Sequence, residues 1–470
     1  MVSIKIDKEQ MKRIIEKTVL VIVFVTFMVA SLILGKYHEF WADEAQSYLI
    51  ARDTSFFELF QVIRYEGTPA LWNIILKIVI AFGLEYQYFW IVPMFFSITG
   101  VFLLLFKTDL PLIVKILFPF TYYVFYQFNV VLRSYCLILP VLVLLSTVYH
   151  NKLEKNYLFS LYLILLLSIS SHTFFMAGFI FLIYLIEFFR NFHQLDKNAK
   201  RKNIISICMI FLAFLITLIY VFPTSNISFV GNKGKNPIVA IANAFFSKNM
   251  AFNWPDTILT IIFIILICIK YEWKKYHLLI LVMLAPIIMI SFFHTELWHF
   301  GIILLAFLFI CIVTNRLKTD YVLLFVFCVI CMIQIHWATE TWRLDYQFCC
   351  SPNEELVAEL KENNYENKVV YGVDYNAIEV NPYFEKNIYD NLKTDKGYFW
   401  WSKTNHYMTE EEMIENPADI YIMFMHGPKD TEDIWLFLNN GEFERKDYFG
   451  IVFAKGEPYV RNFMSIFIKK

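Results

Sequence analysis

The fold is decided by the stretch KYHEFWADEAQSYLIARDTSFFELFQVIRYEGTPALW, residues 36–72, which follows the first apolar run of the chain, residues 19–35. It places several charged side chains, among them Asp43, Glu44, Arg52, Arg64 and Glu66, between two segments apolar enough to lie in a membrane. Charge is costly at such a position unless it faces water or serves a function. We therefore expect residues 36–68 to form an external loop that carries the functional residues.

The composition is typical of an integral membrane protein. Of the 470 residues, 58% are hydrophobic and 19% aromatic, and only 18% are charged, which lies outside the usual balance of soluble domains. The net charge of −1 argues against nucleic acid as a partner. The eight cysteines lie mostly inside apolar runs, where cysteine behaves as a small hydrophobic residue, so no disulfide framework is expected.

Apolar runs define a predicted membrane module, residues 1–338. The first run follows a long charged lead without a small-residue cleavage site, so we expect a retained first span. Eleven further runs follow, at 69–84, 88–106, 111–128, 130–149, 157–171, 172–190, 204–222, 256–270, 277–293, 299–313 and 321–337. Twelve runs conflict with an inner N-terminus and an outer C-terminus, which require an odd number. Because residues 69–106 can be divided in more than one way, we expect about 11 to 13 crossings.

Basic residues orient these spans. Lysine and arginine collect in the connections 151–156, 190–203, 270–275 and 315–318, which are therefore predicted to be cytoplasmic, like the N-terminus. The 36–68 loop, the 223–255 loop and the tail after residue 338 would then be extracytoplasmic. Codon-biased usage of Lys, Ile, Phe and Asn is typical of low-GC microbes, so we expect a multi-pass protein of a bacterial plasma membrane.

Within the external loops the sequence predicts short helices. Residues 42–51 can form one, and Ser55 followed by Glu58 fits a capping box that opens a second. The spacing of Phe56, Leu59, Phe60 and Ile63 predicts a helix lying in the membrane surface. The alternative is a surface helix without function. Residues 238–250 form another candidate interfacial helix, in a loop that is either a cover over a lipid substrate or a plain connector.

Residues 339–470 are predicted to form an extracytoplasmic α/β domain. Ser351 is the expected N-cap of a helix over 351–364. Three short apolar runs, KVVYGVD, DIYIMFM and FGIVFAKG, are predicted strands, and residues 430–440 are a predicted helix between the last two. The aromatic run 398–401 could stack on a sugar, but core packing is the favoured interpretation.

Acidic residues near a lipid interface suit a transfer reaction whose leaving group is anchored in the membrane. When an acceptor hydroxyl displaces a phosphate from the anomeric carbon of a sugar, a fixed carboxylate can take its proton. Asp43 is the first choice for this base. Glu44 and Glu66 could orient the acceptor, and Asp43 with Glu44 could hold a divalent cation such as Mg²⁺ or Mn²⁺.

Cationic groups are needed for the departing phosphate, on which negative charge accumulates. Arg133, in QFNVVLRSYC between two apolar runs, is the best-placed candidate. The alternative for Arg133 is an arginine that extends to the interface without function. Further candidates on the outer side are Arg52, His172 and His299, together with Arg64, Lys248 and His294.

Three short motifs resemble those of the polyprenyl-phosphate-sugar-dependent glycosyltransferases of the GT-C fold, the superfamily of the protein O-mannosyltransferases and aminoarabinose transferases. These motifs are WADEA after the first span, EGTPALW at the start of the next run, and LRSY after a polar break. LWHFG at 297–301 is also similar to bacterial members. The resemblance implies a mainly α, polytopic GT-C-like fold.

The resemblance also implies roles for individual residues. Asp43 would be the catalytic residue of an Asp-Glu pair with Glu44, and Arg133 with Tyr135 would bind the donor phosphate. Glu66 to Pro69 matches the family's Pro-Pro element, except that Thr68 replaces the first proline.

The expected function is therefore a membrane glycosyltransferase that inverts the sugar it moves from a polyprenyl-phosphate donor to a glycan, lipid or protein acceptor. One alternative is a lipid-linked glycan ligase or polymerase, whose usual large late external loop is absent here. Another is a polytopic transporter or flippase, which would place charges or interrupted helices near mid-membrane. The apolar runs carry little such charge.

Overall fold

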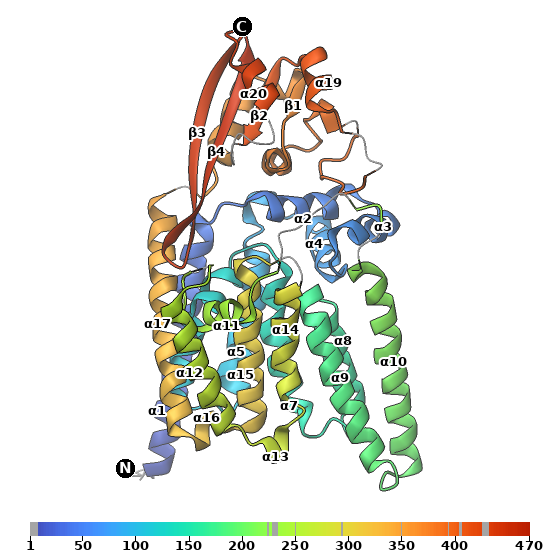
Figure 1. Ribbon diagram of the computed structural model, residues 1–470, viewed down its shortest axis with the longest axis vertical. Helices are drawn as coiled ribbons and strands as arrows, with labels where there is room; N and C mark the ends of the chain where they lie inside the picture. Colours follow the sequence, from blue (N-terminus) through green and yellow to red (C-terminus); the bar gives the residue numbers. More distant parts are fainter. Residues whose placement is uncertain are drawn as a thin grey trace, which may run out of the picture.

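Figure 1 shows a computed structural model of the chain, with a bundle of helices and a smaller domain at one end of it. The structure describes residues 8–222, 225–227, 234–249, 251–292, 295–348, 350–392, 394–403, 407–424 and 432–470. His294 and most of the 223–233 segment lie outside the described residues. The described part of the chain is mainly helical, as the sequence predicts, and its single four-stranded sheet lies in the C-terminal domain.

Six helices are long and apolar enough to cross a membrane. They are α1 (Lys8–Tyr37), α5 (Ile91–Lys107) with the preceding turn η1 (Tyr86–Tyr88), α9 (Ser171–Asn191), α10 (Lys197–Val221), α15 (Phe300–Thr314) with the preceding turn η5 (Leu297–His299), and α17 (Tyr321–Gln347). Such helices indicate a membrane protein. The basic connections α13 (Trp273–Tyr276) and α16 (Arg316–Thr319) lie at the end of the bundle opposite the C-terminal domain (Figure 1).

Other apolar runs form shorter helices, so helix length alone supports fewer crossings than the 11 to 13 expected. These helices are α4 (Leu71–Ala81), α7 (Ile138–Tyr149), α8 (Asn156–Leu167), α12 (Trp254–Lys270) and α14 (Ile280–Phe292). The prediction of one helix over 111–128 is wrong. That run is divided into α6 (Leu112–Leu117), the turn η2 (Phe118–Phe120) and the wide turn η3 (Tyr123–Gln127). Pro119 lies in this break, and proline cannot donate a helical hydrogen bond.

The loop over residues 36–68 contains the two predicted short helices, α2 (Ala42–Asp53) and α3 (Phe56–Glu66). The capping box that opens α3 is confirmed, since the Glu58 N–H donates to Ser55 Oγ at 3.2 Å and the Ser55 N–H donates to Glu58 Oε2 at 3.1 Å. Leu59 and Ile63 are buried within the protein, whereas Phe56 is exposed. Both helices lie between the bundle and the C-terminal domain (Figure 1).

The C-terminal sheet has the order β1-β2-β4-β3, with β1 (Val370–Gly372) parallel to β2 (Ile420–Phe424) and the other pairs antiparallel. All three predicted strands are present, but β3 (Phe443–Ala454) begins earlier than expected and β4 (Glu457–Lys469) was not predicted. Helix α18 (Asn353–Glu362) and the turn η7 (Tyr375–Tyr383) pack against the sheet. The remaining elements are α19 (Glu410–Glu415), α20 (Glu432–Leu438) and the turns η4 (Ser134–Leu137), η6 (Tyr365–Asn367) and η8 (Asp390–Leu392).

Two predictions in this region need correction. The N-cap of α18 is Pro352, not Ser351, because the Ser351 hydroxyl instead donates to Glu379 Oε2 at 2.6 Å.

Helix α11 (Pro237–Phe245) exists where an interfacial helix was expected, but most of its residues are buried inside the bundle. Its Asn243 accepts hydrogen bonds from the ammonium group of Lys455, at the tip of the long β3–β4 hairpin. The hairpin therefore anchors the C-terminal domain to the bundle.

Candidate active site

The first turn of α2 carries Asp43, which faces Arg133. The Arg133 Nη1 atom lies 3.0 Å from Asp43 Oδ2, and the two side chains are 22% and 30% exposed. The hydroxyl group of Tyr375 donates to Asp43 Oδ1 at 3.1 Å. Each carboxylate oxygen thus has one protein partner and retains a second lone pair. The ion pair is fixed in place, yet a ligand can reach it.

Tyr135, His299 and His172 form a second group next to Arg133. The Tyr135 hydroxyl lies 2.8 Å from Nε2 of His299, and the imidazole rings of His172 and His299 are stacked with centroids 4.0 Å apart. The Glu296 N–H donates to His299 Nδ1 at 2.9 Å. A neutral His299 therefore carries its proton on Nε2 and donates to Tyr135. The Tyr135 hydroxyl group, which accepts this hydrogen bond, can then donate its own proton to an acceptor other than His299.

An irregular segment, residues 118–137, supplies Arg133 and Tyr135. Nearly all of its side chains are buried, and its backbone leaves the helical conformation at the break that contains Pro119. Arg133 itself is extended, with φ −130° and ψ 156°. Buried backbone of this kind must find hydrogen-bond partners outside a helix. The Leu132 N–H finds one in the carboxylate of Glu44.

Glu44 is fully buried and faces away from the Asp43–Arg133 pair. Its Oε1 lies 3.1 Å from Nε2 of His38, and its Oε2 accepts the Trp41 N–H at 3.1 Å. Burial by itself would lower the pKa of His38, but the carboxylates of Glu44, Asp345 and Glu39 together outweigh it and the pKa is raised. Glu44 was predicted to be catalytic, whereas these contacts give it a supporting role. It connects α2, His38 and the irregular segment.

Glu66, at the end of α3, lies close enough to Asp43 and Arg133 for electrostatic interaction. Its Oε1 accepts the side-chain amide of Gln46 at 2.8 Å. Burial raises the pKa of Glu66 to about 7, while the Gln46 hydrogen bond acts in the opposite direction. Glu66 is thus able to exchange a proton near neutral pH.

Arg52 is not part of this group. It is nine residues from Asp43 on α2, about 13 Å along a helix. Its guanidinium pairs with Asp53 and donates to the Phe384 carbonyl oxygen at 2.7 Å. Because its donors bind the C-terminal domain, the structure does not support its predicted role at the donor phosphate.

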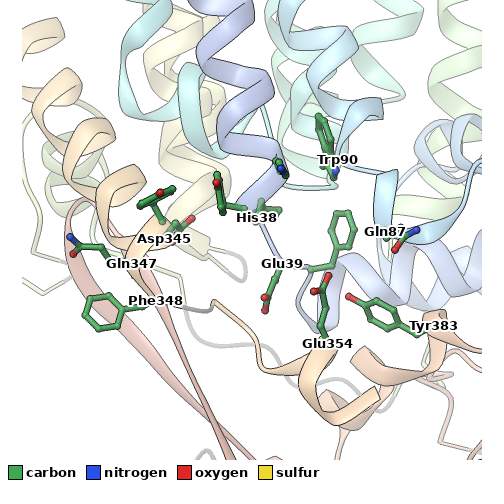
Figure 2. A pocket seen from close by; sticks show the side chains of 13 residues that line it. His38, Glu39, Gln87, Trp90, Asp345, Gln347, Phe348, Glu354 and Tyr383 are labelled. Atoms are coloured by element: carbon green, nitrogen blue, oxygen red, sulfur yellow. The ribbon is translucent and has the colours of Figure 1, made fainter. Parts of the chain in front are cut away.

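A cavity of about 320 Å³ lies near Glu44, at the boundary between the bundle and the C-terminal domain. Figure 2 shows His38, Glu39, Asp345, Glu354 and Tyr383 in its wall. Neither Asp43 nor Arg133 lines it. The cavity therefore gives access to His38, the partner of Glu44, and is separate from the candidate active site.

Asp43 and Glu44 do not fit the divalent-cation site that the sequence suggested. Their carboxylates bind different partners, since Asp43 pairs with Arg133 and Glu44 contacts His38. A cation bound to Asp43 would be repelled by the positively charged guanidinium group of Arg133. Among the residues that the structure describes, no group of three or more His, Cys, Asp or Glu side chains is arranged to hold a metal ion.

The structure thus brings together most of the predicted site residues: Asp43, Glu66, Arg133, Tyr135, His172 and His299. Sequence reasoning missed Tyr375, which is 332 residues from its partner Asp43. It also missed Gln46, which binds Glu66. Tyr375 lies in no recognisable motif, so only the packing of the C-terminal domain on α2 reveals it.

Comparison of the chain with protein-family models, with curated proteins and with solved structures found no match.

Proposed function

We propose that the protein is a membrane glycosyltransferase that moves a sugar from a polyprenyl-phosphate donor to a hydroxyl group of an acceptor, with inversion at the anomeric carbon. The observation that carries this proposal is the solvent-accessible Asp43–Arg133 pair, with Tyr135, His299 and His172 beside it. A carboxylate and a group of phosphate-binding side chains are the two components that this reaction requires.

Asp43 acts as the general base. The acceptor oxygen forms a bond to the anomeric carbon from the face opposite the phosphate, and the bond between this carbon and the phosphate oxygen breaks. The acceptor proton passes to Asp43, and polyprenyl phosphate leaves with the electrons of the broken bond. Hydrogen bonds from Arg133 and Tyr375 keep the carboxylate oriented, with one lone pair on each oxygen available to the acceptor.

Arg133 stabilises the phosphate. A guanidinium group has five N–H donors in a planar fork that suits phosphate oxygens, and only Nη1 contacts Asp43. One further donor contacts the Tyr135 hydroxyl, and the remaining donors can bind phosphate while the ion pair persists. The Tyr135 hydroxyl adds a donor on the same side, and His299 holds this hydroxyl in place.

The position of the site supports a lipid-linked donor. Two candidate membrane spans, α9 and α15 with its preceding turn η5, begin at this group, since His172 and His299 lie at their starts and stack on each other. A phosphate whose polyprenyl chain lies among the apolar helices could therefore reach Arg133, which contacts Asp43 at the start of α2. Helix α2 lies between the bundle and the C-terminal domain (Figure 1).

Transfer assays with purified protein in lipid test the proposal. Radiolabelled polyprenyl-phosphate sugars are incubated with candidate acceptors, and wild type is compared with Asp43→Asn. We expect the variant to lose transfer by at least a hundredfold. The matched control is Asp109→Asn, which changes an exposed carboxylate at the opposite end of the bundle and should retain wild-type transfer. Equal transfer by a folded Asp43→Asn protein would remove the proposed base, and movement of the intact donor across the membrane would indicate a transporter.

A further inference from the structure

The C-terminal domain brings aromatic rings to the Asp43–Arg133 pair. The ring of Tyr375, whose hydroxyl donates to Asp43, lies 4.9 Å from that of Trp401. The Phe399 ring is 4.7 Å from Trp401 and is stacked on Tyr407 at 4.4 Å. We call Tyr375, Phe399, Trp401 and Tyr407 the aromatic group.

Helix α2 fixes the aromatic group relative to Asp43. The Phe399 N–H donates to Gln46 Oε1 at 2.8 Å, and the Gln46 amide donates back to the Phe399 carbonyl oxygen. Two residues before Phe399, the Gly397 N–H donates to Asp53 Oδ2 at 2.7 Å. Because the same helix carries Asp43, the rings and the proposed base form one rigid unit.

The aromatic group is not simply part of the hydrophobic core. Tyr398, in the middle of the aromatic run 398–401, is only 2% exposed and belongs to the core. All four rings of the aromatic group, in contrast, are half-buried, although Tyr375 and Phe399 pack against that core on one side and Tyr407 packs against the core of the C-terminal domain. They present ring surface next to a carboxylate that is itself partly exposed.

We infer that the aromatic group binds the acceptor, and that the acceptor presents a sugar to it. A pyranose has apolar C–H faces that pack on aromatic rings, and hydroxyl groups at its rim that bind carboxylates, phenols and amides. Here the rings stand beside the Asp43 carboxylate, the Tyr375 hydroxyl and Glu66. A sugar stacked on Trp401 would present a hydroxyl group to Asp43. This inference rests on the proposed function and names its acceptor class.

This site also assigns a role to the C-terminal domain, which supplies the acceptor half of the active site. The bundle supplies Arg133, Tyr135 and the two histidines for the donor. An acyl chain of a lipid acceptor would pack on the apolar helices, whereas the aromatic group belongs to the C-terminal domain, which lies at one end of the bundle (Figure 1).

Saturation-transfer NMR tests sugar binding without requiring transfer activity. The full-length protein in nanodiscs is mixed with glucose, galactose, mannose, N-acetylglucosamine or their β-linked disaccharides. We expect at least one sugar to receive saturation from wild type and to lose at least tenfold in affinity with Trp401→Ala. Trp401→Phe, which keeps an aromatic ring, should restore part of the loss. The control Phe449→Ala removes a partly exposed ring on β3 and should bind like wild type.

The outcomes separate this inference from the proposed function. No binding to wild type, or equal binding to wild type and Trp401→Ala, overturns the acceptor site. Transfer to a peptide or lipid that Trp401→Ala leaves unchanged also overturns it, although the glycosyltransferase proposal would then stand. Conversely, sugar binding that Trp401→Ala abolishes supports the site even when no transfer is found.

Discussion

Glu379 joins the external loop to the C-terminal domain, and its titration gives a stringent test of how the two parts are held together. Its Oε1 accepts the N–H of Ala42, the residue before Asp43, at 2.8 Å. Its Oε2 accepts the Ser351 hydroxyl at 2.6 Å and the Asn353 amide at 3.2 Å. The side chain is 2% exposed, and burial raises its pKa to about 8.

The raised pKa fixes the sign of the pH dependence. Below the unfolded pKa of 4.5, Glu379 is protonated in both states. Between 4.5 and about 8 only the folded protein holds the proton, so the free energy of unfolding falls as pH rises and stays low above pH 8. At about 1.4 kcal/mol for each pKa unit, the total change is at most about 5 kcal/mol. Glu66 and Asp374, each with a pKa raised to about 7, change stability in the same direction.

Glu379→Gln isolates the contribution of this carboxyl, because glutamine keeps an acceptor for the Ala42 N–H but cannot ionise. Thermal unfolding of detergent-solubilised protein is measured between pH 5 and 9. We expect the melting temperature of wild type to fall with rising pH and that of Glu379→Gln to fall clearly less. Glu362→Gln, at an exposed position of α18, should follow wild type. Parallel curves for wild type and Glu379→Gln would refute the assignment of a neutral, buried carboxyl at the domain contact.

Three further predictions concern the donor site, the hairpin and the orientation. Arg133→Lys keeps the positive charge but loses the planar set of N–H donors, so we expect kcat/KM for the donor to fall by at least about tenfold. Unchanged kinetics would exclude a contact in which two guanidinium N–H groups bind the phosphate. Lys455→Met leaves the carbonyl oxygens of Asn243 and Ser247 without their ammonium donor and should destabilise the protein by about 1–3 kcal/mol, whereas the exposed Lys470→Met should melt like wild type. In a cysteine-free background, a membrane-impermeant thiol reagent should label Glu362→Cys in intact cells and Lys274→Cys only after permeabilisation; the reverse pattern would place the site in the cytoplasm.

Local sequence signals predicted the elements of the external loop well. The capping box at Ser55 and Glu58, the helical spacing of α2 and the apolar run of α1 each depend on neighbours within a few residues. The break in the 111–128 run was missed, although Pro119 is visible in the sequence. The run is uniformly apolar, so its residues show no hydrophobic periodicity that would distinguish a membrane-spanning helix from a buried irregular segment. Strand β4 was missed because its polar residues interrupt the alternation expected of a strand.

The site depends more on tertiary contacts than the elements do. The charges of Asp43, Glu66 and Arg133 stand out against apolar surroundings, and this contrast made them candidates. Their division into roles could not be predicted, since the neighbours Asp43 and Glu44 have identical chemistry in the sequence. Only the contacts of Asp43 with Arg133 and of Glu44 with His38 separate a partly exposed carboxylate from a buried one.

The break in the apolar runs explains why two acids stand together at the start of α2. A regular helix over residues 118–137 would satisfy its own backbone and hold Arg133 on a helix face. The irregular segment instead extends the chain at Arg133, which directs the guanidinium to Asp43, and leaves the Leu132 N–H to be satisfied from outside. Glu44 satisfies it at the cost of being buried, and the His38 ring, whose pKa is raised beside this carboxylate, lies within hydrogen-bond distance of it. One acid therefore stabilises the backbone that positions Arg133, which allows the other to remain accessible for chemistry.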